Sequence, residues 1–221
     1  MPDLALMLLA DARLPAGAHT QSAGLEPALT AGMAPGDIPA YLVVRLRTVA
    51  TVDAGTAVCA LRVLRGQSPH PLAAVLAHWA ARTPSQVQRQ ASVTLGRGAL
   101  RLLRSLFPDH PATLAMALVD QPSRPLVLAG LAAALDLTGE QLAALVGYDE
   151  VQSVCSAALK LAPLDPVQTV RWALAARPEV EDLVCRVAGT VDPADIPAPA
   201  APLAEAWAHA HSRLTRRLFS A

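Results

Sequence analysis

The chain has few aromatic residues, and this scarcity restricts the kind of core it can build. Of 221 residues only 3% are Phe, Trp or Tyr, although 53% are hydrophobic. The core must therefore consist mainly of Ala, Leu and Val, and alanine has the highest intrinsic helix propensity. Runs of β-branched residues are short, and no Asn-Gly or Asp-Gly pair marks a hairpin turn. The sequence predicts an all-α, single-domain helical bundle of about ten helices over residues 1–221, with no sheet.

Net charge is also absent. The 18 basic side chains balance the 18 acidic ones, and Lys160 is the only lysine. A protein that binds nucleic acid by neutralising phosphates needs a basic excess, so we expect no nucleic-acid partner. No apolar run reaches the roughly 18–20 residues of a membrane span. Asp3 and Asp11 flank the first apolar run, where a signal peptide would need basic residues. We therefore expect no membrane partner either.

Cysteine pairs are missing as well. Cys59, Cys155 and Cys185 are far apart, and each is set among apolar residues. An odd, scattered set of this kind is typical of free, buried thiols in a reducing compartment. We therefore predict a cytoplasmic protein.

Catalytic motifs are absent from the sequence. It contains no GxSxG, no Walker A loop, no HExxH and no GxGxxG, and no nucleophile–base–acid set can be placed. The best metal candidates are His209 and His211, but residues two apart on a helix point in nearly opposite directions. We therefore predict that the chain is not an enzyme, has no metal site and binds no cofactor stably.

Proline and glycine divide the chain into helical segments. Asp37 is expected to cap a long helix to about residue 65, with Arg45, Arg47, Asp53 and Arg62 on its wetter side. Thr83 and Thr138 are each expected to start a helix as a cap. Cap-forming residues and apolar periodicity predict further helices at 71–82, 83–107, 114–119, 124–137, 140–161, 167–177 and 180–188. A Pro/Ala-rich linker at 190–202 then leads to a last helix, 203–218, with an apolar stripe of Leu203, Trp207, Ala210, Leu214 and Leu218.

The stretch 8–26, LLADARLPAGAHTQSAGLE, organises the start of the chain. A short apolar helix is expected to break where proline and glycine follow Leu14. A second helix should begin near Ser22, whose hydroxyl can accept a bond from a first-turn N–H. The polar loop between them serves either as helix capping or as an exposed functional loop.

Two glycines interrupt the apolar pattern in the middle of the expected 83–107 helix. Glycine inside a helix costs about 1 kcal/mol relative to alanine. Gly96 and Gly98 therefore predict a point where another backbone approaches closely. The alternative is an ordinary helix crossing flanked by solvated arginines.

Four stretches of the sequence, in order, resemble the urease accessory protein family UreF. The first is the run from Asp11 to Glu26, with Gln21 standing where the family usually has histidine. The others are Arg89-x-x-Ser92-x-x-x-Gly96-Arg97, the turn Leu161-Ala162-Pro163-Leu164, and the C-terminal Ser-Arg-Leu-Phe-type ending. The sequence departs from the family pattern at Gln21, Ala129, Asp165 and Pro166.

The resemblance implies a non-enzymatic assembly factor. It implies an all-α homodimer that binds UreD (also called UreH), recruits the nickel-carrying GTPase UreG and delivers nickel to apo-urease, so that nickel acts through the complex. A second hypothesis is that the chain modulates GTP hydrolysis by UreG through Arg13, Arg89 or Arg97. A third, of another class, is a helical DNA- or ligand-binding regulator.

The matching positions supply the expected partner contacts. They lie in the four stretches, and at Lys160 beside the third. They are Arg13, Pro15, Gly17, Ser22, Gly24, Leu25, Glu26, Arg89, Ser92, Gly96, Arg97, Lys160, Pro163, Leu164, Arg213, Arg217, Leu218 and Phe219.

Overall fold

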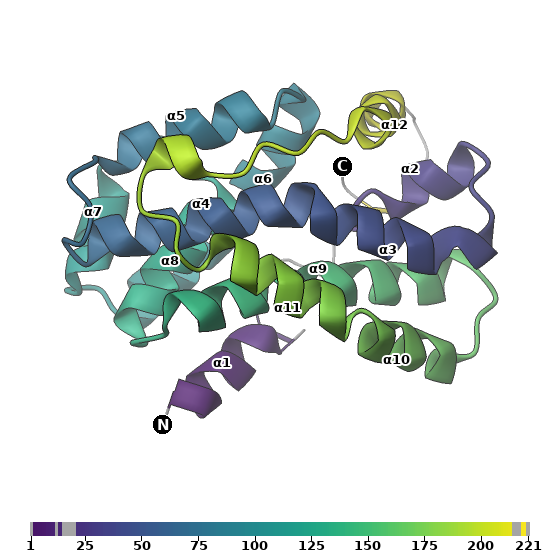
Figure 1. The fold of residues 1–221 in the computed structure, drawn as a ribbon, viewed down its shortest axis with the longest axis horizontal. Helices are drawn as coiled ribbons and strands as arrows, with labels where there is room; N and C mark the ends of the chain where they lie inside the picture. The colour runs from purple at the N-terminus through teal and green to yellow at the C-terminus, as the bar shows by residue number, and fades with distance from the viewer. Residues whose placement is uncertain (1, 12, 15–20, 214–217, 220–221) are drawn as a thin grey trace.

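The computed structural model describes residues 2–11, 13–14, 21–213 and 218–219. Within this part of the chain there are twelve α-helices, two short 3-10 helices and no strand (Figure 1). The all-α prediction is therefore confirmed. None of the described helices is both long enough and apolar enough to cross a membrane.

Most neighbouring helices are joined by short connections, and many of these contain proline or glycine. They are α1 (Pro2–Ala10), α2 (Leu25–Thr30), α3 (Ile38–Arg47), α4 (Val49–Leu64), α5 (Leu72–Arg82), α6 (Gln86–Leu106), α7 (Pro111–Ala117), α8 (Arg124–Ala134), α9 (Gly139–Leu161), α10 (Pro166–Ala175), α11 (Arg177–Val187) and α12 (Pro202–Ser212). The 3-10 helices are η2 (Pro35–Asp37) and η3 (Pro193–Asp195).

Helix α4 lies in the centre of the bundle, packed against α5, α8, α9 and α11 (Figure 1). Nearly every residue of its middle is buried, including Ala54, Ala57, Val58 and Ala60 at 0% exposure. A helix that is apolar all round is stable only inside a shell of other helices. Its small side chains let those neighbours approach closely, which is how a sequence poor in aromatics builds its core.

The expected single helix from 37 to 65 is wrong in two ways. It ends at Arg47 and restarts at Val49, because Thr48 has the non-helical angles φ −118° and ψ −94°. Thr48 Oγ1 donates to the carbonyl of Val44 and Thr51 Oγ1 to that of Leu46, so side chains satisfy carbonyls near the break. Asp37 makes no capping hydrogen bond.

The other helix starts follow the predicted chemistry with one shift. Thr138 and Gln141 form the expected capping box of α9, and Asp165 caps α10 by accepting the N–H of Val167 at 2.9 Å. Helix α6, however, is capped by Ser85 and not by Thr83, since Ser85 Oγ accepts the N–H of Gln88. Pro84 therefore precedes the capping residue Ser85 and lies outside the helix.

Helix α9 runs past Gly147 without interruption. A Cβ at Gly147 would lie 3.0 Å from Cγ1 of Val180 in α11. The glycine therefore makes room for the neighbouring helix and does not mark a helix end.

The 190–202 segment is pinned to the bundle and is not a loose linker. It crosses α4 and α5 (Figure 1), and Ile196 is 2% exposed. Arg82 donates from Nε to the carbonyl of Ile196 at 2.6 Å and from Nη2 to that of Ala194 at 2.8 Å. One arginine side chain thereby replaces the backbone partners that an extended segment lacks.

The last helix is shorter than the expected 203–218 and uses another face. It ends at Ser212, and residues 214–217 lie outside the described part. Leu203 is 59% exposed and Ala210 is also exposed, whereas His211 is the buried residue. The predicted apolar stripe is therefore wrong for these positions, because the carboxylate of Glu26 draws His211 inward.

The cysteines are all free, as predicted, but their burial differs. Cys59 and Cys155 are buried, and burial raises the pKa of each thiol to about 11. Cys185 is exposed, so the expectation of three buried thiols is wrong at this position.

Candidate functional site

The first turn of α2, near the start of the chain, contacts the C-terminal segment. Gly24 adopts φ +76°, a left-handed conformation that glycine tolerates best, and ends the connection to α2. Ser22 Oγ accepts the N–H of Glu26, as the sequence predicted. Glu26, now fixed in the first turn of the helix, is 8% exposed and directs its carboxylate toward the C-terminal segment.

The Glu26 carboxylate accepts three hydrogen bonds from residues near the end of the chain. The N–H of Leu218 donates to Oε1 at 2.7 Å, and the N–H of Phe219 donates to Oε2 at 3.0 Å. Nε2 of His211 also lies 3.0 Å from Oε2. A buried carboxylate needs this number of donors, so the contact is a specific junction between α2, α12 and the tail. We call these four residues the terminal junction.

The terminal junction directs His209 and His211 to different partners. His211 is 2% exposed and bound to Glu26, whereas His209 is exposed and lies 3.5 Å from Ser85 Oγ. Among the described residues there is no group of three or more His, Cys, Asp or Glu side chains that could hold a metal ion.

A polar cavity of about 150 Å³ adjoins the terminal junction. Its walls come from the 21–27 segment, α4, α5, α6, α9 and α12, and include Ser22, Gln88, Ser92 and His211. Two arginines, Arg45 and Arg124, and the carboxylates Asp53 and Glu150 also line it. Charged side chains from helices far apart in the sequence thus meet at this cavity, among apolar ones.

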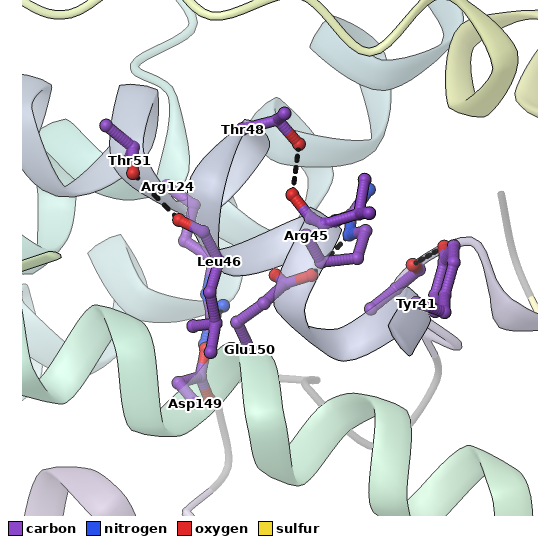
Figure 2. Close-up of polar contacts among 10 residues, drawn as sticks. Tyr41, Arg45, Leu46, Thr48, Thr51, Arg124, Asp149 and Glu150 are labelled. Atoms are coloured by element: carbon purple, nitrogen blue, oxygen red, sulfur yellow. Dashed lines mark hydrogen bonds and ion pairs between the residues drawn. The ribbon is translucent and has the colours of Figure 1, made fainter. Parts of the chain in front are cut away.

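The arginines of the cavity are each paired with an acidic residue of α9. Arg45 Nε lies 2.5 Å from Oε1 of Glu150, and Arg124 is ion-paired with Asp149 (Figure 2). The expectation that Arg45 lies on a wetter face is wrong, because the break at Thr48 separates its helix from α4 and Arg45 is only 7% exposed. These pairs cross the bundle and hold α3 and α8 against α9.

Asp53, which the sequence also placed on the wetter face, points into the same interior. Its Oδ1 accepts a hydrogen bond from the indole N–H of Trp79 at 2.9 Å. Burial raises the pKa of Asp53 to about 6, and the nearby charge of Glu150 adds to this effect, while the bond from Trp79 opposes it. The charge of Asp53 therefore changes near pH 6.

The segment of α6 from Arg89 to Arg97, the second of the four family-like stretches, holds one wall of the cavity in place. A Cβ on Gly96 would lie 2.5 Å from the carbonyl oxygen of Pro122, which confirms the predicted close backbone approach. Ser92 Oγ accepts the N–H of Arg124 at 3.1 Å and so caps the start of α8. Arg89 donates to the carbonyls of Thr83 and Pro84 before its own helix.

The expected partner contacts separate into buried and exposed groups. Ser22, Leu25, Glu26, Gly96 and Phe219 are buried inside this structure. The exposed group consists of Arg13, Arg97, Lys160, Pro163, Arg213 and Leu218. Four others are half-buried, namely Gly24, Arg89, Ser92 and Leu164. Pro15, Gly17 and Arg217 lie outside the described residues.

The third and fourth stretches meet at Lys160. Its ammonium lies 5.1 Å from the centre of the Phe219 ring, a cation–π distance. Arg13, in contrast, is ion-paired with the neighbouring Asp11 at 2.6 Å.

Sequence reasoning missed two of the charged residues that line the cavity, Arg124 and Glu150, and also Asp149, the partner of Arg124. A usable signal existed, because Asp149-Glu150 interrupt an otherwise apolar face between Val146 and Val151. Charged pairs in such a position are buried only when opposite charges face them.

The fold and the cavity define a helical protein whose interior contains ion pairs between helices. The model of the UreF family matches residues 34–177. The chain is 35% identical over 97% of both chains to the urease accessory protein UreF of Mycobacterium sp. (strain JLS). It is 34% identical over 99% of both chains to UreF of Mycobacterium tuberculosis (strain ATCC 25618 / H37Rv). The UreF of Mycobacterium marinum (strain ATCC BAA-535 / M) is 37% identical over 75% of this chain and 76% of its own.

The chain therefore belongs to the UreF family of urease accessory proteins. Its role is that of an accessory protein and not of an enzyme. This agrees with the absence of a catalytic motif in the sequence.

Proposed function

We propose that this chain is a homodimeric, cytoplasmic scaffold that bridges UreD/UreH and the GTPase UreG while nickel is delivered to apo-urease. The terminal junction carries this proposal. It anchors the tail at Glu26 and leaves Leu218, 73% exposed, on the surface beside buried Phe219. An apolar side chain held outward by a rigid backbone is suited to insert into a partner protein.

A second face suits contact between two copies of the chain. Helix α1 exposes Leu4, Met7 and Leu8 at 59%, 68% and 53%, and Tyr148 on neighbouring α9 is 42% exposed. An open hollow between α1 and α9 is lined by Leu6, Met7, Ala144 and Tyr148. A self-complementary apolar patch of this type fits a two-fold interface.

Co-expression with UreD/UreH and UreG tests the bridging role. The expected result is one complex containing all three proteins by size exclusion with mass measurement, lost when residues 213–221 are deleted. Met7→Glu is expected to halve the mass of the free protein while UreD/UreH binding persists. A monomeric wild-type chain that binds neither protein would refute the scaffold proposal.

The alternative role, modulation of GTP hydrolysis by UreG, is favoured by one arginine. Of the three candidates, Arg89 is held by two carbonyls and Arg13 by Asp11, whereas Arg97 is exposed and forms no ion pair with any described residue. An arginine acting on a nucleotide in another protein must be free in this way. GTP turnover by UreG should then change on adding the chain, and Arg97→Ala should abolish the change. Turnover equal with and without the chain would eliminate this alternative.

A further inference from the structure

Residues 190–201, which join α11 to α12, lie extended across α4 and α5 (Figure 1). We call them the strap. Apart from η3 the strap has no helix, so its backbone groups need partners from elsewhere in the protein. The guanidinium of Arg82 donates to two strap carbonyls, those of Ala194 and Ile196. A shift of the Arg82 guanidinium would therefore loosen the middle of the strap.

The third nitrogen of the same guanidinium contacts His78, one helical turn earlier on α5. Nη1 of Arg82 lies 3.1 Å from Nδ1 of His78 and donates to the His78 carbonyl, also at 3.1 Å. A guanidinium can only donate, so Nδ1 must accept with its lone pair, and the proton of the neutral ring is then on Nε2. This contact therefore requires an uncharged His78.

Other charged groups lie on the two elements that pack against α5. They are Asp53 and Arg62 of α4, and Asp192 and Asp195 of the strap. Asp53 accepts the indole N–H of Trp79, and Arg62 donates to the carbonyl of Ala188. Asp192 interacts electrostatically with His78. A protonated His78 is thus repelled by Arg82 and attracted by Asp192.

We propose that His78 is a pH-sensitive release for the strap. Histidine ordinarily gains a proton between about pH 8 and pH 5. A protonated His78 has no lone pair at Nδ1 and carries the same charge as Arg82, so their contact becomes repulsive. Because the contact favours the neutral ring, its contribution is present at higher pH and is lost as pH falls. The strap is then held by Arg82 at neutral pH and loosened in acid.

A second histidine, His70, acts on the strap with the opposite sign. Its Nε2 lies 3.4 Å from Oδ2 of Asp192, and this pair is ionic only when His70 is protonated. Acid therefore strengthens the attachment at the beginning of the strap while it weakens the attachment at Ala194 and Ile196. The part that is released is the part that leads into α12.

Loosening of the strap affects the polar cavity through α12. The strap enters α12 at Pro202, whereas the far end of α12 is held by the terminal junction. Ala204 and Ala208, in the first two turns, line the cavity. Release of the strap thus frees the start of α12 while its end stays fixed, and this uncovers one side of the cavity in acid.

Amide hydrogen exchange of the strap at pH 5.5 and pH 7.5 tests the proposal, with each rate divided by the intrinsic rate at that pH. We expect the strap amides to exchange about fivefold faster at pH 5.5 by this measure, while the amides of α4 keep their protection. In His78→Asn the side-chain oxygen can replace Nδ1 as acceptor and does not titrate. The strap of this variant should therefore exchange equally at both pH values. His70→Asn should enlarge the difference, because the opposing pair is lost.

His110→Asn is the matched control. His110 also uses Nδ1 as an acceptor, for the N–H of Ala112 at the start of α7, and it does not touch the strap. This variant should keep the pH dependence of the wild-type strap. The same pH dependence in His78→Asn as in wild type would overturn the proposal, as would wild-type strap exchange that does not change with pH. Equal acceleration of the α4 amides in acid would also overturn it, because the whole protein would then be opening. None of these results depends on a partner protein, so the proposed function stands or falls separately.

Discussion

Glu26 and His211 are separated by 185 positions in the sequence, yet Oε2 of Glu26 lies 3.0 Å from Nε2 of His211 in the interior. The side chains are 10% and 2% exposed, so neither is solvated by bulk water. The contact ties the first turn of α2 to the last turn of α12. Since Glu26 also accepts two backbone N–H groups of the tail, one carboxylate fixes the positions of two chain segments.

Glu26→Gln should loosen both segments. The amide keeps the size of the side chain, but its NH₂ group faces a donor and one accepting oxygen is lost. Hydrogen bonds to charged groups contribute about 1.5–3 kcal/mol, so we expect about 2 kcal/mol less stability in urea unfolding. Trypsin should also cleave faster after Arg213. Glu205→Gln, the same change elsewhere on α12, is the control, and equal losses in both variants would contradict the role of the terminal junction.

The Arg45–Glu150 pair should behave as a coupled unit. Arg45→Met alone leaves Glu150 without its cation and should cost about 3 kcal/mol, as should Glu150→Met. The double variant should cost clearly less than the two single variants together, because no unpaired charge remains buried. Urea unfolding of the four proteins gives the coupling energy. Additive losses would show that the pair does not interact in the folded state.

Asp53 predicts a dependence of stability on pH. Burial raises its pKa from 3.8 to about 6, so the folded state binds a proton more tightly than the unfolded state. Its contribution is most favourable below the unfolded pKa, and it is lost as pH rises through about 6. Asp53→Asn removes the charge and keeps an acceptor for Trp79. We expect the variant to exceed wild type by about 1–3 kcal/mol at pH 8 and by much less at pH 5.

The same comparison in Asp37→Asn provides the control, because Asp37 is exposed. The difference between variant and wild type should there be small at both pH values. A gain for Asp53→Asn that is equal at pH 5 and pH 8 would contradict the titration of Asp53.

Gly96→Ala should separate α6 from the start of α8. The added Cβ would lie 2.5 Å from the carbonyl oxygen of Pro122, and a backbone atom cannot move aside cheaply. We expect a loss of about 2 kcal/mol or more despite the higher helix propensity of alanine. Gly36→Ala, where no heavy atom lies within 4 Å of the new Cβ, should change stability by less than about 0.5 kcal/mol. Thermal unfolding of both variants measures the difference.

Local chemistry made most of the fold predictable. The capping box at Thr138, the cap at Asp165 and the helix at α5 follow from residues within one turn of each other. The break at Thr48 did not, because no proline or glycine marks it. Threonine is acceptable inside a helix as well as at its end, so only the packing of α3 and α4 against α9 decides between them.

The candidate site was predictable only in part, since its contacts are long-range. The UreF-like stretches gave Glu26, Ser92, Gly96 and Phe219 as important positions, but as partner contacts. The contacts that these residues make inside the protein, such as that of Glu26 with Phe219, could not be derived from spacing along the chain. Arg124 and Glu150 were missed because each forms its ion pair with a helix far away in the sequence, so that local spacing does not reveal the partner.

The terminal junction also sets an order of events during synthesis. Glu26 is made 193 residues before Phe219, so the carboxylate lacks this amide donor until Phe219 has been made. Ala204, Ala208 and His211 of α12 form one wall of the polar cavity, which consequently stays open to solvent over the same period. Closing so long a loop is entropically costly and comes late in folding. Until α12 has packed, a folding chain therefore leaves the charged side chains of the cavity uncovered on that side.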